Sequence, residues 1–134
     1  MTVPILDTNT IVLIYAVDMS TKPPNERVAM GELAFHILLA LGAGAAHGYA
    51  IGLEIEERSG GRLRPTTGAL YQALKRLRDD GVIELDRAAA KTSPDARRKY
   101  FHLTTLGREV AAAEARRLDA LVTTARARHL YERS

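Results

Sequence analysis

The chain of 134 residues has no cysteine, which excludes a disulfide framework, a thiolate zinc site and a thiol nucleophile. It also lacks long apolar runs: the longest, Ile11–Val17, is far short of the roughly 20 residues that a membrane span needs. We expect no secretory signal, because Asp7 precedes that run and no Lys or Arg does. These absences favour a protein of the cytoplasm without a membrane partner.

The net charge of +3 is distributed unevenly along the chain. Residues 1–57 hold two basic and seven acidic side chains, a net charge of −5, whereas residues 58–134 hold seventeen basic and nine acidic ones, a net charge of +8. A positive surface attracts polyanions, and neutralisation of phosphates is the usual source of affinity for nucleic acids. Charge alone raises the expectation of a nucleic-acid partner only modestly.

Histidine is the remaining candidate for metal binding. The four histidines, His36, His47, His102 and His129, include no pair at a spacing of three or four residues, and no cysteine assists them. We therefore expect no metal, no cofactor and no catalytic residue.

The first 28 residues form a separate extension of unknown role, bounded by the loop that contains Pro23 and Pro24. Within it, residues 5–9 and 13–18 resemble the opening strand of PIN-type ribonucleases, in which a first aspartate helps to hold magnesium. Such a site needs several carboxylates on a larger α/β domain, and nothing after residue 18 supplies one. A PIN-like metal-dependent ribonuclease fragment is therefore kept only as the alternative function.

Three helices are predicted next. Apolar residues recur at helical spacing over residues 30–41, and a short helix opens at residues 47–49 and closes at residues 59–61. The third helix has Thr66 or Thr67 as its cap and Gly81 as its terminator. Its buried stripe consists of Leu70, Leu74 and Leu77.

Two strands and a long helix complete the chain. Residues 82–86 and 99–103 are predicted as the strands of a hairpin whose long, polar tip spans residues 87–98. Thr104 or Thr105 caps a last helix that runs to about Tyr131, about 40 Å at 1.5 Å per residue. Its inward stripe is predicted to comprise Leu106, Val110, Leu118, Leu121, Val122 and Ala125.

The order helix, helix, helix, hairpin is that of a winged helix, a helix-turn-helix variant whose third helix enters the major groove. Several separated motifs occur in order at residues 47–49, 55–61, 64–71, 74–77, 80–83 and 97–107. Together they strongly resemble the PadR family of transcriptional regulators, in particular its smaller members with a single C-terminal helix. The resemblance implies that His47, beside Gly48, is a turn or capping residue. The predicted fold is mainly α with a small β-hairpin, a winged-helix domain over residues 29–104 and a dimerisation helix over residues 105–134.

Three positions depart from the family pattern. Thr67 and Gln72 stand where many members have proline, and Leu53 occupies a position that is usually polar. The first two substitutions change the first turn of the recognition helix without removing its cap.

The resemblance implies a DNA-binding regulator, most readily a homodimeric repressor of a near-palindromic operator. For some family members it also implies release by small aromatic or drug-like effectors, although no residue here specifies one. We expect the exposed face of the third helix to contact double-stranded DNA, with phosphate contacts from the wing and from the segment before that helix. The predicted DNA-binding residues are Thr66, Thr67, Gly68, Tyr71, Gln72, Lys75, Arg62, Arg64, Lys91, Arg97, Arg98 and Lys99.

The last helix is longer than one small winged-helix body needs. We expect its continuing apolar stripe to pair two copies of the chain, the predicted dimerisation residues being Leu118, Leu121, Val122 and Ala125. The competing interpretation folds this stripe back on the N-terminal segment of the same chain. A winged helix used only for protein contact would need an acidic recognition face, and Lys75 and Arg76 argue against it.

Overall fold

The computed structural model describes residues 30–95 and 97–132, so the predictions for residues 1–28 lie outside the described residues. Met30–Arg108 forms one compact unit, and the residues from Glu109 onward belong to a second. The elements in chain order are α2 (Glu32–Gly42), β1 (Ala46–His47), α3 (Gly48–Arg58), α4 (Thr67–Asp79), β2 (Ile83–Leu85), α5 (Arg87–Lys91), β3 (Tyr100–Leu103) and α6 (Thr105–Ala127).

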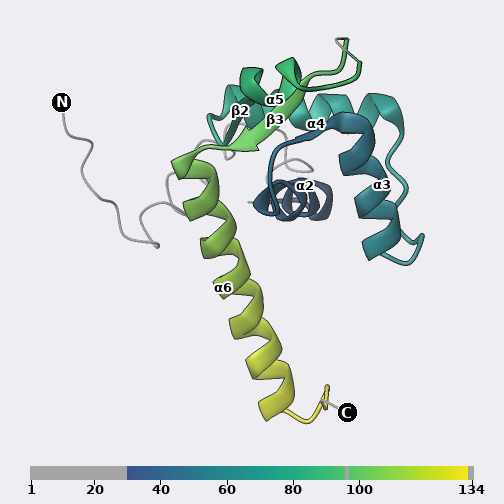
Figure 1. Ribbon diagram of the computed structural model, residues 1–134. Helices are drawn as coiled ribbons and strands as arrows, with labels where there is room; N and C mark the ends of the chain where they lie inside the picture. Colours follow the sequence, from purple (N-terminus) through teal and green to yellow (C-terminus); the bar gives the residue numbers. More distant parts are fainter. Residues whose placement is uncertain (1–29, 96, 133–134) are drawn as a thin grey trace, which may run out of the picture. The chain divides into compact units, whose positions relative to one another are not determined.

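Helix α2 lies at the centre of the first unit and contacts α3, α4 and β3 (Figure 1). The apolar stripes that the sequence predicted are the ones that become buried, because each amphipathic helix must cover its apolar face. The largest fully buried side chains are Ile37, Leu38, Leu41, Ile51, Ile55, Leu74, Leu77, Val82 and Ile83. The three predicted helices are confirmed.

Helix α4 begins and ends as its sequence indicates. The N–H of Ala69 donates to the Thr66 hydroxyl oxygen at 3.1 Å, which satisfies one of the free amides of the first turn. At the other end Gly81 has φ of 78°, a left-handed conformation that favours glycine. These two ends set the residues of α4 that face outward.

The sheet has one strand more than the predicted hairpin. Its order is β1-β3-β2, with β3 antiparallel to both neighbours, and β1 adds only Ala46 and His47, paired with Phe101 and Tyr100. The loop between β2 and β3 also contains the short helix α5, where a polar tip was expected. Asp86 caps α5 by accepting from the N–H of Ala89 at 2.8 Å.

Helix α6 departs from the prediction at two points. It ends at Ala127 rather than near Tyr131, and His129 has φ of 58° just beyond that end. Leu106, predicted to pack inward, is 39% exposed, whereas Gly107 and Val110 are buried. Successive helical residues turn by about 100°, so the face that carries Gly107 points Leu106 outward.

The later part of α6 carries apolar side chains that the single chain leaves exposed. Leu118, Leu121 and Val122 all belong to this group, and Ala125 is half-buried.

Within the described residues, no helix is both long enough and apolar enough to span a membrane.

Candidate nucleic-acid interface

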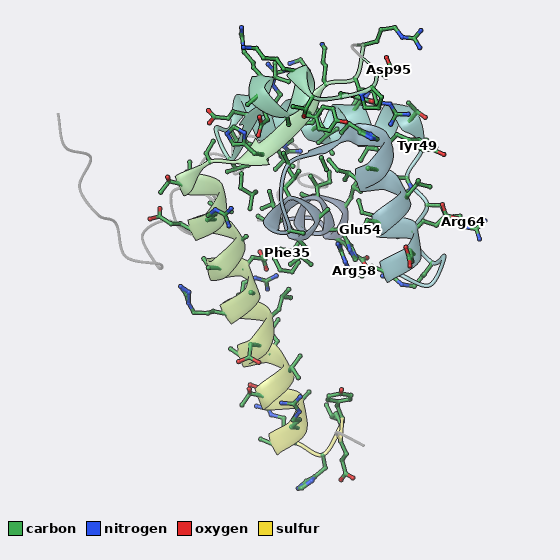
Figure 2. All side chains as sticks on the ribbon, in the orientation of Figure 1. Phe35, Tyr49, Glu54, Arg58, Arg64 and Asp95 are labelled. Carbon is green, nitrogen blue, oxygen red and sulfur yellow. The ribbon has the colours of Figure 1, made fainter. Side chains whose placement is uncertain are left out.

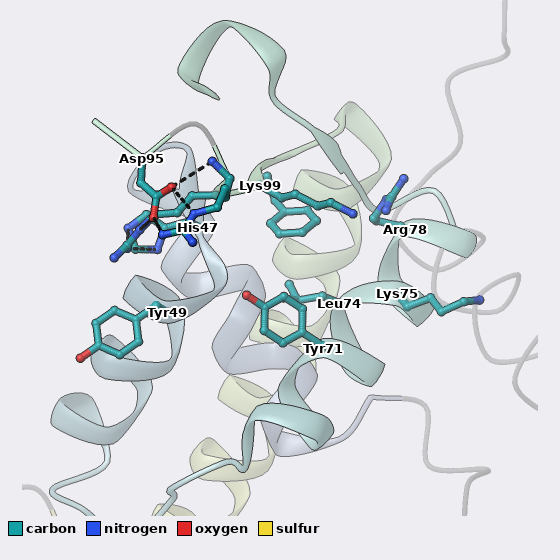
Figure 3. A pocket seen from close by; sticks show the side chains of 11 residues that line it. His47, Tyr49, Tyr71, Leu74, Lys75, Arg78, Asp95 and Lys99 are labelled. Carbon is teal, nitrogen blue, oxygen red and sulfur yellow. Dashed lines mark hydrogen bonds and ion pairs between the residues drawn. The ribbon is translucent and has the colours of Figure 1, made fainter. Parts of the chain in front are cut away.

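A cavity of about 660 Å³ lies on the first unit between α4, the start of α3 and the loop before β3. Figure 3 shows Tyr71 of α4 near the middle of the lining residues, with Tyr49 of α3, His47 and Asp95 to one side of it. Basic side chains dominate the lining, and Asp95 is its single acidic residue. The lining residues are His47, Tyr49, Tyr71, Leu74, Lys75, Arg78, Asp95, Arg97, Arg98, Lys99 and Phe101.

Helix α4 contributes one face to the cavity. Tyr71, Lys75 and Arg78 are spaced at i, i+4 and i+7, so they project from the same side of the helix. Each follows one of the buried leucines, so this side lies about 100° round the helix from the buried stripe. The Lys75 ammonium lies 2.9 Å from Asp79 on the next turn, an exposed pair that contributes little to stability. Lys75 therefore remains available to an incoming anion.

Tyr71 reaches across from α4 to the beginning of α3. A Cβ atom on Gly48 would lie 2.8 Å from the Tyr71 hydroxyl oxygen, closer than such atoms pack. The missing side chain of Gly48 therefore makes room for the Tyr71 ring.

His47 joins the wing to α3. Its Nδ1 accepts from the N–H of Ala50 at 3.1 Å, which confirms the predicted capping role. Its Nε2 lies 2.6 Å from Nη1 of Arg98, and the Arg98 guanidinium is 5.6 Å from the centre of the Tyr49 ring. Burial, together with the nearby charge of Arg98, lowers the pKa of His47, so the ring is held neutral and keeps its acceptor.

Asp95 lies between the two arginines of the wing. It accepts from the backbone N–H of Arg97 at 2.9 Å and from Nε of Arg97 at 3.2 Å, and Nε of Arg98 is 3.7 Å away. The backbone and side-chain hydrogen bonds from Arg97 lower the pKa of Asp95, with the charge of Arg98 adding to the effect. The carboxylate is therefore ionised at neutral pH.

The structure brings five of the predicted DNA-binding residues together around the cavity: Tyr71, Lys75, Arg97, Arg98 and Lys99. Thr66, Thr67, Gly68 and Gln72 are exposed on the first turns of α4, and Lys91 is exposed at the end of α5.

The two arginines of the segment before α4 lie apart from the cavity. Arg62 forms an ion pair with Glu32. Arg64 points away from the body of the unit and lies 3.3 Å from Glu56 (Figure 2).

A second, smaller cavity of about 260 Å³ lies between α3 and α4. Its lining includes Leu53, Thr67 and Tyr71, and Leu53 is exposed. Leu53, the apolar residue at a position where the family pattern predicts a polar one, thus lies on the same side of α3 as Tyr49.

Six residues that line the main cavity were not among the predicted site residues: His47, Tyr49, Leu74, Arg78, Asp95 and Phe101. Arg78 could have been found, because it continues the spacing of Tyr71 and Lys75 along α4. Tyr49 and Asp95 had no such signal, since the fold of the sheet and of the wing loop brings them to α4.

Among the described residues, no group of three His, Asp or Glu side chains could hold a metal ion.

Comparison with known proteins identifies relatives in sequence and in structure. Residues 37–113, more than half of the chain, match the transcriptional regulator PadR-like family. The chain is 40% identical over 85 residues to an uncharacterised 37.1 kDa protein in transposon TN4556 of Streptomyces fradiae, a match that covers 63% of this chain and 22% of that protein. This chain thus aligns with only about a fifth of that relative's length.

Solved structures share the fold. A PadR family transcription regulator from Clostridium difficile R20291 has a TM-score of 0.59 at 22% identity, covering 72% of this chain and 96% of that one. Bacillus subtilis PadR, solved in complex with operator DNA, has a TM-score of 0.52 at 27% identity, covering 62% of this chain and 46% of that one. The predicted winged-helix fold is confirmed, and the chain belongs to the PadR-like family of transcriptional regulators, which are not enzymes.

Proposed function

We propose that this chain is a sequence-specific DNA-binding regulator that acts as a homodimeric repressor. In this proposal α4 enters the major groove of a near-palindromic operator, while the wing and the segment before α4 contact phosphates. The observation that carries it is the convergence of Lys75, Arg78, Arg97, Arg98 and Lys99 around one cavity beside the exposed face of α4. The complex of the related B. subtilis protein with operator DNA supports the same partner.

Each predicted contact has a stated role in this proposal. Gln72 pairs with a base edge in the manner of Gln with adenine, and Lys75 reaches guanine or a phosphate. Thr66, Thr67, Gly68 and Tyr71 line the approach of α4 to the groove. Arg62, Arg64, Lys91, Arg97, Arg98 and Lys99 neutralise phosphates.

Two further elements of the proposal rest on the family alone. The related regulators described above come from bacteria, in which the DNA lies in the cytoplasm, so we propose the same location for this chain. Release of the operator by a small-molecule effector is proposed by analogy with relatives, and no described residue specifies the chemistry of such a molecule. The ribonuclease alternative depends on residues 5–18, which lie outside both the described residues and the family match.

Selection of bound sequences from random duplex DNA, repeated at two salt concentrations, tests the function directly. A regulator of this kind enriches one near-palindromic sequence, and its affinity falls steeply as salt rises because phosphate contacts release counterions. Absence of enrichment at both salt concentrations would contradict the proposal.

Reversal of the wing charges tests the phosphate contacts. Arg97→Glu combined with Arg98→Glu should weaken binding to every DNA sequence and flatten its salt dependence, because two phosphate partners are lost. Fluorescence anisotropy with labelled duplexes across a salt series measures both effects. The matched control is Arg126→Glu with Arg128→Glu, the same charge change on two exposed residues at the end of the chain. Equal losses of DNA affinity in the two double variants would show that affinity depends only on the net charge of the protein, and would contradict the phosphate contacts of the wing.

A further inference from the structure

Asp95 lies among the cations of the wing. The segment between β2 and β3 contains Arg87, Lys91, Arg97, Arg98 and Lys99, and its two acids are Asp86, which caps α5, and Asp95. The Asp95 carboxylate faces two of the arginines, through Oδ1 to Arg97 at 3.2 Å and through Oδ2 to Arg98 at 3.7 Å. Figure 3 marks interactions of the Asp95 carboxylate with dashed lines at one edge of the main cavity.

The two arginines are held to different degrees. The Arg97 side chain is 92% exposed, and Asp95 is its ion-pair partner. The Arg98 side chain is 39% exposed and lies against the His47 ring and over the Tyr49 ring as well. Arg98 is thus fixed at the edge of the cavity, whereas Arg97 can turn toward a ligand once its carboxylate partner is released.

A carboxylate and a phosphate present similar paired oxygens to a guanidinium group, and both form charge-assisted hydrogen bonds with it. The Asp95 side chain is 34% exposed, so an anion from solvent can reach the site that it occupies. A backbone phosphate that binds Arg97 and Arg98 has to displace the Asp95 carboxylate. If it does not, the two negative groups lie close together and repel each other.

We propose that Asp95 limits the DNA affinity of the wing: its carboxylate occupies the phosphate site formed by Arg97 and Arg98, and a phosphodiester of DNA takes its place on binding. This inference rests on the proposed DNA-binding function, and it adds that Asp95 lowers the affinity for DNA. The occupant is a phosphate of the duplex backbone, so the effect is independent of base sequence.

The variant Asp95→Asn tests the inference with little disturbance of the loop. The asparagine amide oxygen can still accept from the N–H of Arg97, so the local turn is retained while the charge is removed. We expect this variant to bind duplex DNA about two- to fivefold more tightly than the parent, the range set by exposed ion pairs. The gain should shrink as salt screens the repulsion.

Two controls make the result specific. Glu57→Gln makes the same charge change at an exposed side chain that has no ion-pair partner in the described part of the chain, and it should leave affinity nearly unchanged. In a double-mutant cycle, Asp95→Asn should give no gain in the background of Arg97→Gln and Arg98→Gln, because the competition acts through these arginines.

The readout is the dissociation constant for a fluorescein-labelled duplex of random sequence, with thermal melting as a check of folding. Unchanged or weaker binding by Asp95→Asn, while the parent binds DNA, would overturn the inference and leave the proposed function intact. A gain that persists without the arginines would overturn it as well. If neither the parent nor the variant binds any duplex, the proposed function itself fails, and the inference fails with it.

Discussion

Gly107 shows how one absent side chain decides a packing contact. A Cβ atom at this position in the first turn of α6 would overlap the carbonyl oxygen of Val82. That same carbonyl accepts from the N–H of Thr104 at 3.2 Å, and the Thr104 hydroxyl donates to the oxygen of Gly81 at 2.6 Å. The start of α6 is therefore fixed to the segment before β2 by backbone contacts that leave no room for a methyl group.

Gly107→Ala should accordingly destabilise the protein by about 1 to 3 kcal/mol, the usual cost of overpacking, since a backbone atom must move. Urea denaturation followed by circular dichroism measures the free energy of unfolding. Gly68→Ala is the matched control, because a Cβ atom there meets nothing within 4 Å. Equal stability of the Gly107→Ala variant and the parent would contradict the close contact.

Gln72 is the residue on which sequence preference is predicted to depend. It is exposed on α4, one position beyond Tyr71. Gln72→Ala should reduce preference for the selected operator by about 1 to 3 kcal/mol per base contact while leaving non-specific affinity nearly unchanged. Titration of selected and scrambled duplexes separates the two quantities. A uniform loss on both duplexes would make Gln72 a positioning contact instead.

At the scale of elements, the wing is more than a two-stranded hairpin. His102 on β3 lies directly opposite Glu84 on β2, with its Nε2 2.7 Å from the Glu84 carboxylate and its Nδ1 3.0 Å from Asp86. Asp86 also caps α5. One imidazole thus links both strands to the short helix that precedes the basic loop.

This cluster predicts a pH dependence of stability. The hydrogen bond to Glu84, together with that to Asp86, raises the pKa of His102 above its ordinary value of 6.5. A raised folded-state pKa means that the folded protein holds the proton more tightly, so this stabilisation is complete below pH 6.5 and is lost as pH rises through the folded-state pKa.

Urea denaturation at about pH 6 and about pH 8.5 measures the free energy of unfolding of the parent and of His102→Gln. The variant should lack the decrease in stability that His102 causes between these pH values, because glutamine keeps hydrogen bonding without titrating. The lowered pKa of His47 acts in the opposite direction, since its stabilisation is lost as pH falls below 6.5. The relevant quantity is therefore the difference between parent and variant at each pH. A difference that does not change with pH would refute the role of His102.

At the scale of the whole molecule, α6 determines how copies of the chain could associate. Its 23 residues extend about 35 Å at 1.5 Å per residue. Leu118, Leu121 and Val122 remain exposed on it, with Leu121 at 57%. We propose that these residues and Ala125 pair with a second copy, which would set two α4 helices about 34 to 36 Å apart, one turn of DNA.

Leu118→Glu combined with Leu121→Glu should convert the dimer to a monomer, because burying two carboxylates in an apolar interface is strongly unfavourable. Multi-angle light scattering at micromolar concentration measures the mass of parent and variant. Leu130→Glu is a control that adds one negative charge at a highly exposed apolar residue beyond the helix. A monomeric parent, or a dimeric double variant, would contradict the assignment.

The sequence by itself determined α2, α3 and α4, because each carries an apolar stripe at helical spacing and recognisable ends. The family motifs determined the winged-helix class. Tertiary structure alone decided β1, since two residues have no periodicity and become a strand only by pairing with β3. It also assembled the cavity, where Tyr49, Tyr71 and Asp95 are separated along the chain. Helix α5 lies between these cases: Asp86 before an alanine-rich segment was a capping signal, but a five-residue helix is too short to show a stripe. Periodicity and capping are local properties, whereas a site depends on contacts between segments that the sequence does not place in space.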